Sequence, residues 1–114
     1  MTYEELLIIL SGIEPEEALN ELRENPNHKH KSGYEFIIKK YGYFAYLYAK
    51  DVIKGRWPEA EEIIKTYPFT AYYYARDVIK GRWKEAEEYI KKDLSYAYGY
   101  ARNVIGDENF WDKN

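Results

Sequence analysis

The chain has 114 residues, 46% of them hydrophobic and 32% charged, which fits one soluble globular domain. It has no cysteine, which excludes disulfides and thiolate metal sites and favours the cytoplasm, and no apolar run near the ~20 residues of a membrane span, so a membrane partner is not expected. Residues 1–26 carry seven acids and one base (−6), and residues 27–114 carry sixteen bases and thirteen acids (+3), a balance far from the strongly basic one of duplex-DNA binders, so duplex DNA is disfavoured.

The N-terminal segment is predicted to be a divergent pair of helices. Residues 2–5 (TYEE) form a capping-box pattern, and the apolar run LLIIL follows. Residues 12–15 (GIEP) have the Gly-to-Pro spacing of residues 55–58 (GRWP). We therefore expect Tyr3–Leu22 to form two helices.

A polar loop is predicted next, over residues 25–33 (NPNHKHKSG), because Asn-Pro and Ser-Gly favour turns. His28 and His30 lie in it with no nearby acid or cysteine to complete a metal site. We interpret the segment as a basic loop that can touch a partner. Residues 1–33 are accordingly set apart from a repeat body, residues 34–114.

The body is defined by a repeat of about 26 residues. Ala49–Glu62 and Ala75–Glu88 differ at only two positions, where Lys50 and Pro58 are replaced by Arg and Lys. The same offset aligns three segments without a gap: Ala45–Ile53, Ala71–Ile79 and Ala97–Ile105. Periodicity of this length predicts an all-α fold of stacked helix-turn-helix repeats, a small solenoid-like single domain.

Each unit is expected to contain two helices. The first has an apolar face at helical spacing: Ala71, Tyr74, Ala75, Val78 and Ile79. Gly81 is predicted to end it with a positive φ. The shorter second helix is predicted to bury Ala60, Ile63, Ile64 and Tyr67 in one copy, and Ala86, Tyr89 and Ile90 in the next.

Three groups are predicted to hold the stack together. Trp57 and Trp83, at the turns, are expected to plug the space between units. The repeated acids and arginines are expected to form ion pairs between neighbouring units: Asp51, Asp77, Arg56 and Arg82. Phe110 and Trp111 are expected to fold back as a cap over the last unit.

A strip of tyrosines and cations is the candidate binding site. Equivalent positions of stacked units line up, which would create a ladder of rings bordered by positive charge: Tyr46, Lys50, Tyr72, Arg76, Lys80, Tyr98 and Arg102, with Lys54 beside them. Such a strip could hold an acidic protein segment, a nucleotide or single-stranded nucleic acid. The alternative is a solvated flank on which tyrosine covers the edge of the core.

Enzymatic activity is not expected, because no nucleotide-loop, dinucleotide, serine-hydrolase or zinc-protease motif is present, and no cofactor is implied. The motif AYxYAxDVIKGRWPEAE resembles short tandem helical repeats of uncharacterised bacteriophage and bacterial proteins, over roughly residues 44–105. This chain departs from the pattern in its degraded third copy and its N-terminal third.

The resemblance implies a non-enzymatic adaptor, or an inhibitor of a host defence protein, located in the host cytoplasm for a viral protein. We therefore expect a protein-interaction module. The alternative is a protein that sequesters an anionic nucleotide or signalling molecule, and self-association is a further option.

Overall fold

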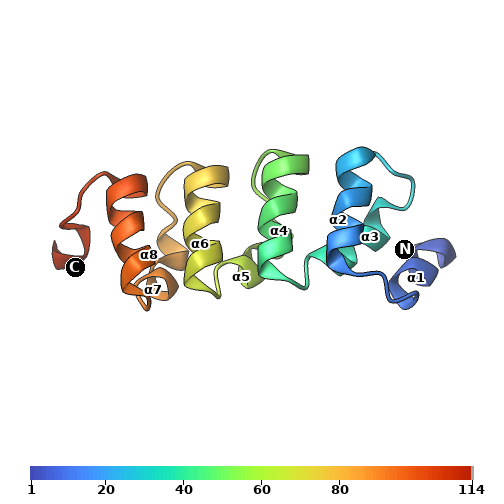
Figure 1. Cartoon of the computed structure of the whole chain (residues 1–114), viewed down its shortest axis with the longest axis horizontal. Coiled ribbons are helices and arrows are strands. Elements are labelled where there is room, and N and C mark those ends of the chain that lie inside the picture. The colour runs from blue at the N-terminus through green and yellow to red at the C-terminus, as the bar shows by residue number, and fades with distance from the viewer. Residues whose placement is uncertain (114) are drawn as a thin grey trace.

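The computed structural model describes residues 1–113 and shows an elongated all-α single domain of 52 × 21 × 18 Å, without strands in that range (Figure 1). The predicted stack of helical units is confirmed. Eight α-helices occur among the described residues: α1 (Tyr3–Leu10), α2 (Pro15–Glu24), α3 (Lys31–Ile38), α4 (Gly42–Tyr48), α5 (Glu61–Ile64), α6 (Pro68–Tyr74), α7 (Glu87–Ile90) and α8 (Leu94–Gly99). None of these helices is long and apolar enough to cross a membrane.

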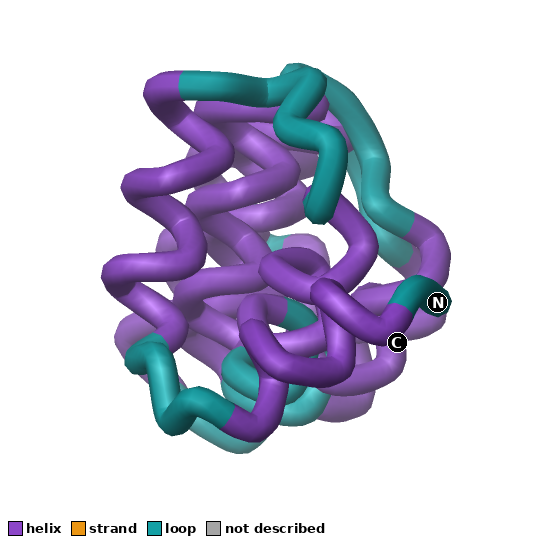
Figure 2. The backbone as a smooth tube through the Cα atoms, turned by 90° about the vertical axis from the view of Figure 1, so that its right-hand side faces the viewer, coloured by secondary structure: helices purple, strands orange, loops and turns teal. Residues whose placement is uncertain are grey.

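The helices form two layers. α2, α4, α6 and α8 stand in a row, with shorter helices between them (Figure 1), and the two sets lie on opposite sides in the view along the stack (Figure 2). Each unit is thus one longer and one shorter helix, the latter begun by a 3₁₀ turn in the second and third pairs, η2 (Pro58–Ala60) and η4 (Lys84–Ala86).

The longer helix of each repeat ends in a π-helical turn, which the sequence analysis did not anticipate. The turns are η1 (Ala49–Ile53), η3 (Ala75–Ile79) and η5 (Tyr100–Ile105). Ala71, Tyr74 and Ala75 are fully buried as predicted, but Val78 and Ile79 are only half-buried. The physical reason is that i→i+5 bonding rotates the last residues of the turn away from the α-helical face.

The left-handed residue that ends each turn is not the one predicted. Gly81 has no positive φ; Lys54 and Lys80, each with φ 60°, occupy that conformation, and Gly106 occupies it in the third copy with φ 84°. The backbone N–H of Lys80 donates to the carbonyl oxygen of Ala75 at 2.8 Å, and this bond completes the π turn. The change to a left-handed backbone therefore occurs at Lys80, one residue earlier than expected.

A buried aromatic clamp sets the register between units. Tyr74 is fully buried, its hydroxyl donates to Glu61 of the preceding unit at 2.7 Å, and it accepts the backbone N–H of Trp57 at 2.7 Å. The Trp57 and Trp83 rings are buried, and the Trp83 ring lies 4.9 Å from the Tyr74 ring, which confirms the tryptophans as interlayer plugs. The equivalent bonds recur one unit on, from Tyr100 to Glu87 and from Trp83 to Tyr100.

The N-terminal helices extend this design. The capping box at Thr2 and Glu5 is confirmed, and α1 and α2 are the two predicted helices. The predicted loop over residues 25–33 is too long, because α3 begins at Lys31 and packs against both α1 and α2. Gly33 permits this packing, since a Cβ there would lie 3.1 Å from the Glu5 carbonyl oxygen.

The expected boundary at residue 33 falls inside α3. α2 and α3 form the first longer–shorter pair, and Glu35 on α3 receives the Tyr48 hydroxyl at 2.8 Å, as Glu61 receives that of Tyr74. α1 lies ahead of this pair as an additional short helix.

The aromatic cap is confirmed. η6 (Phe110–Lys113) folds against the third unit, and the Phe110 and Trp111 rings lie 6.1 and 5.8 Å from the Tyr100 ring. The indole N–H of Trp111 donates to the carbonyl oxygen of Ala97 at 2.7 Å. Trp111 and Phe110 therefore stand near Tyr100 as Trp83 stands near Tyr74.

Candidate functional site

The flank of the longer helices carries a second row of contacts between units. The Tyr46 hydroxyl donates to Asp77 of the next unit, and Asn103 donates to the Tyr72 hydroxyl at 2.9 Å one unit further on. At the corresponding position of the first repeat, Asp51 accepts from Arg23 of α2 at 2.7 Å. The repeated Asp therefore contributes to register, as expected.

The predicted arginine partners of these acids were wrong. Arg56 binds Glu61, with both bonds at 2.8 Å, and Arg82 binds Glu87 at 2.8 and 3.0 Å. These glutamates lie five residues after the arginine, at the start of the following short helix, so pairing is local. The Arg56 guanidinium lowers the pKa of Glu61 and keeps it ionised as the acceptor of the Tyr74 hydroxyl.

The tyrosines of the strip do not form an exposed ladder. Tyr46 and Tyr72 are 5% and 6% exposed, whereas Tyr98 is 49% exposed and bonds weakly with Arg102 at 3.4 Å. Burial, and the hydrogen bond to Asp77, raise the pKa of Tyr46. The hydroxyls of the two inner tyrosines are thus occupied by the stack.

Two cations of the strip, Arg76 and Lys50, each lie near an acid and near an aromatic ring. Arg76 binds Asp77 at 2.7 Å and lies over the Tyr72 and Tyr73 rings, at 5.3 and 5.0 Å from their centroids. This ion pair lowers the pKa of Asp77. Lys50 lies 3.6 Å from Asp51 and 5.9 Å from the Tyr46 ring centroid. Both side chains combine charge with an aromatic surface, the arrangement of a cation–π contact.

Two adjoining hollows on this flank share Lys50. An aromatic hollow of about 360 Å³ is lined by Tyr43, Tyr46, Leu47, Lys50, Tyr73 and Arg76. A basic hollow of about 390 Å³ is lined by Lys50, Lys54, Gly55, Asp77, Val78 and Lys80. We call the two together the basic–aromatic groove.

Lys54 and Lys80 differ from the other cations of the groove. Within residues 1–113, neither ammonium lies within ion-pair distance of an acid, while Asp77 is taken by Arg76 and Tyr46. Both lysines also occupy the left-handed backbone region that glycine occupies in the third unit. The groove consequently presents two uncompensated positive charges to solvent.

Tyr43 and Tyr73 line the groove but were not singled out from the sequence. A ladder of equivalent positions, one per unit, was the only signal used, and it selects Tyr46 and Tyr72. The signal that could have found Tyr73 is its position beside Tyr72 in the run AYYYAR, because neighbouring side chains on a helix lie about 100° apart and can border the same flank.

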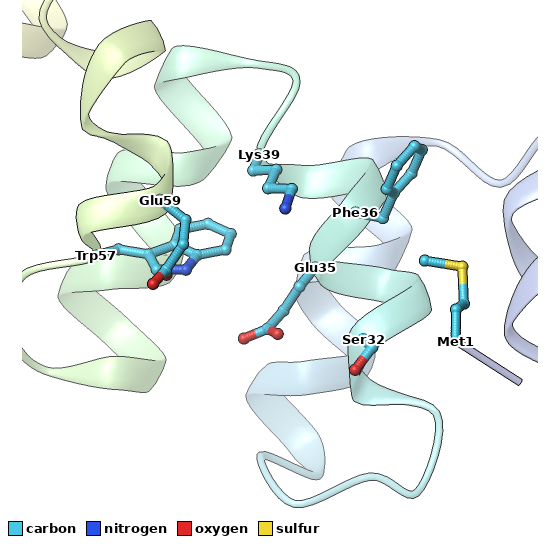
Figure 3. Close-up of a pocket in the computed structure, with 7 residues that line it drawn as sticks. All are labelled: Met1, Ser32, Glu35, Phe36, Lys39, Trp57 and Glu59. Atoms are coloured by element: carbon cyan, nitrogen blue, oxygen red, sulfur yellow. The ribbon is translucent and has the colours of Figure 1, made fainter.

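Another hollow lies beside α3. The hollow of about 250 Å³ drawn in Figure 3 lies where α3 meets Trp57, and its Glu35 carboxylate accepts from Tyr48. With the 26-residue offset, His30 corresponds to Arg56 and Glu35 corresponds to Glu61. In this unit a histidine therefore occupies the sequence position of the arginine. Among the described residues no group of three or more His, Asp and Glu side chains could hold a metal ion.

Neither the family models nor the curated proteins nor the solved structures contain a match to this chain.

Proposed function

We propose that the protein is a non-enzymatic protein-interaction module that binds an acidic segment of another protein in the basic–aromatic groove. The observation that carries this proposal is the placement of Lys54 and Lys80. A side chain in the left-handed region costs about 1–2 kcal/mol, and the third unit avoids that cost with Gly106. A role of the two ammonium groups in binding an acidic partner would explain why lysine, and not glycine, occupies this position in the two units that form the groove.

The groove suits an extended segment. It crosses from one unit to the next along the stack, its aromatic half provides flat contact surface, and its basic half provides charge. The stacked helices hold these groups before a partner arrives, which limits the entropy lost on binding. The resemblance to phage repeats suggests bacterial host proteins, defence proteins among them, as the first set to search.

The second candidate is a binder of an anionic nucleotide or signalling molecule, with Tyr73 and Arg76 beside the base and the lysines at the phosphates. Arg76 lying over two tyrosine rings favours it. It ranks second because the hollows, of about 390 and 360 Å³, are near the lower limit of small-molecule sites.

The test is capture of proteins from a bacterial lysate by the full chain, with the captured proteins identified by mass spectrometry. The Lys54→Gly, Lys80→Gly double variant removes both charges and is compatible with the backbone, so it should fold and lose the captured protein. Lys40→Ala, which removes an exposed lysine just after α3, outside the groove, is the matched control and should retain it.

Equal capture by the double variant and the native chain would contradict the proposal. A nucleotide panel separates the second candidate: a true ligand at a hundredfold excess over Kd stabilises the native chain by about 2.7 kcal/mol, and should not stabilise the double variant.

A further inference from the structure

The N-terminal helix α1 exposes an apolar face to solvent, while Glu5, Ile8 and Ile9 lie on its inward side. Tyr3, Leu6, Leu7 and Leu10 follow the i, i+3, i+4, i+7 spacing of one face, and this face is exposed, with Leu10 at 79%. The opposite face holds the buried Glu5, whose carboxylate accepts the Gly33 backbone N–H at 2.9 Å. A continuous apolar helix face directed to solvent marks an interaction surface.

The other end of the stack has an apolar hollow of about 720 Å³. Its apolar lining residues are Leu94, Ala97, Phe110 and Trp111, and its charged lining residues, here called the rim, are Arg82, Lys84, Glu87, Glu88, Lys91 and Lys92. Leu94 is 86% exposed. Five of these residues have exact register equivalents around a smaller hollow of about 260 Å³ inside the stack: Arg56, Pro58, Glu61, Glu62 and Lys65.

The size difference has a structural cause. In the second repeat, η4 leads into α7, which packs against α6. In the third repeat η6 stands at the position of η4, and the described residues contain no counterpart of α7 against α8. The large hollow, here called the seat, therefore lies where a counterpart of α7 would pack.

We infer that this seat binds α1 of a second copy of the chain, so that the protein associates head to tail. α1 is a short helix followed by a longer one, as α7 is followed by α8, and its insertion would continue the alternation of layers across the junction. The two surfaces lie at opposite ends of the 52 Å axis, so one copy cannot join its own ends (Figure 1).

Charge favours the same pairing. Exposed acids surround the apolar face of α1 along α1 and the start of α2, namely Glu4, Glu14, Glu16 and Glu17. The seat has four basic and two acidic residues on its rim, and Glu87 is already paired with Arg82. Two α1 faces would repel each other, whereas α1 and the seat attract, so the contact is heterologous.

The test is the mass of the full chain in solution, measured by sedimentation velocity over a range of concentrations. The native chain should grow beyond a dimer as concentration rises. Leu10→Glu and Leu94→Glu each change one exposed leucine and place a carboxylate in the contact, so each variant should be monomeric with unchanged helicity.

A one-to-one mixture of the two variants is decisive. One intact α1 then meets one intact seat, while both outer ends carry the new carboxylate, so dimers should form and nothing larger. The Lys54→Gly, Lys80→Gly variant is the control and should associate like the native chain, which keeps this test separate from that of the groove.

Three results would overturn the inference. The native chain could stay monomeric up to about 1 mM, where a contact of even millimolar Kd would be half-formed. The mixture could remain monomeric. Leu94→Glu could leave association intact while Leu10→Glu abolishes it, which would assign the α1 face to a different partner.

Discussion

The repeat units and α1 handle their polar groups in opposite ways. In the units, tyrosine hydroxyls, glutamates and arginines form closed internal networks and the apolar residues face the core. In α1 the acid Glu5 faces inward beside Ile8 and Ile9, and four apolar residues face outward. The units thus use their polar groups for contacts within the stack, whereas α1 leaves an apolar face in solvent.

The largest expected effect comes from breaking the clamp of the units. Tyr74→Ala removes a fully buried ring and leaves Glu61 and the Trp57 N–H without a hydroxyl, so it should lower the free energy of unfolding by about 3–5 kcal/mol. Urea denaturation followed by circular dichroism measures this. Tyr98→Ala is the control and should stay within about 0.5 kcal/mol, because Tyr98 is half exposed. Equal losses would show that the clamp contributes nothing.

Stability should fall at both extremes of pH. Folding lowers the pKa of Glu61, from an ordinary value of 4.5, mainly through Arg56, so its stabilisation is present above about pH 4.5 and is lost as pH falls through the lowered pKa. Burial raises the pKa of Tyr48, Tyr74 and Tyr100 above the ordinary 10.0, so their stabilisation is lost as pH rises above about 10.

The free energy of unfolding, measured by urea titration at several pH values, should therefore be flat between these limits. A midpoint that declines steadily from pH 6 to pH 9 would contradict this assignment, because none of the groups named titrates there.

A smaller and local effect is expected at α1. Glu5→Ala removes the acceptor of the Gly33 N–H and the reciprocal bond of the capping box, so α1 should detach while the units remain folded. Hydrogen exchange should become faster for the α1 amides and unchanged for α6. Glu4→Ala, an exposed acid one residue earlier, is the control. Uniformly faster exchange along the stack would mean that α1 is part of the cooperative core.

The smallest effect concerns the left-handed lysines. Lys80→Gly relieves a strain of about 1–2 kcal/mol, offset by the greater unfolded entropy of glycine, about 0.4–1 kcal/mol. A net gain of about 0.5–1 kcal/mol is expected, and Gly106→Lys should lose a similar amount. Thermal denaturation measures both. A loss of stability in Lys80→Gly would show that the lysine is retained for the fold and would remove the main support for the groove.

Much of the architecture follows from the sequence alone. A 26-residue offset, helical spacing of Ala71, Tyr74 and Ala75, and an aromatic residue at each turn predict the stack, its core and its plugs, because periodic burial is a local property of the chain. The cap at Phe110 and Trp111 was predictable for the same reason.

Only the tertiary structure decided which of several possible side chains each repeated acid binds. Asp51 and Asp77 had several cations within reach, and only the stacked geometry assigns them to Arg23, Tyr46 and Arg76. Tyr67 has the spacing of a core residue but is 51% exposed, because α5 ends at Ile64 before reaching it. Lys50, Lys54 and Lys80 were expected on one flank, but the π turns before Lys54 and Lys80, and the left-handed conformation of these two residues, were not, because they depart from α-helical periodicity.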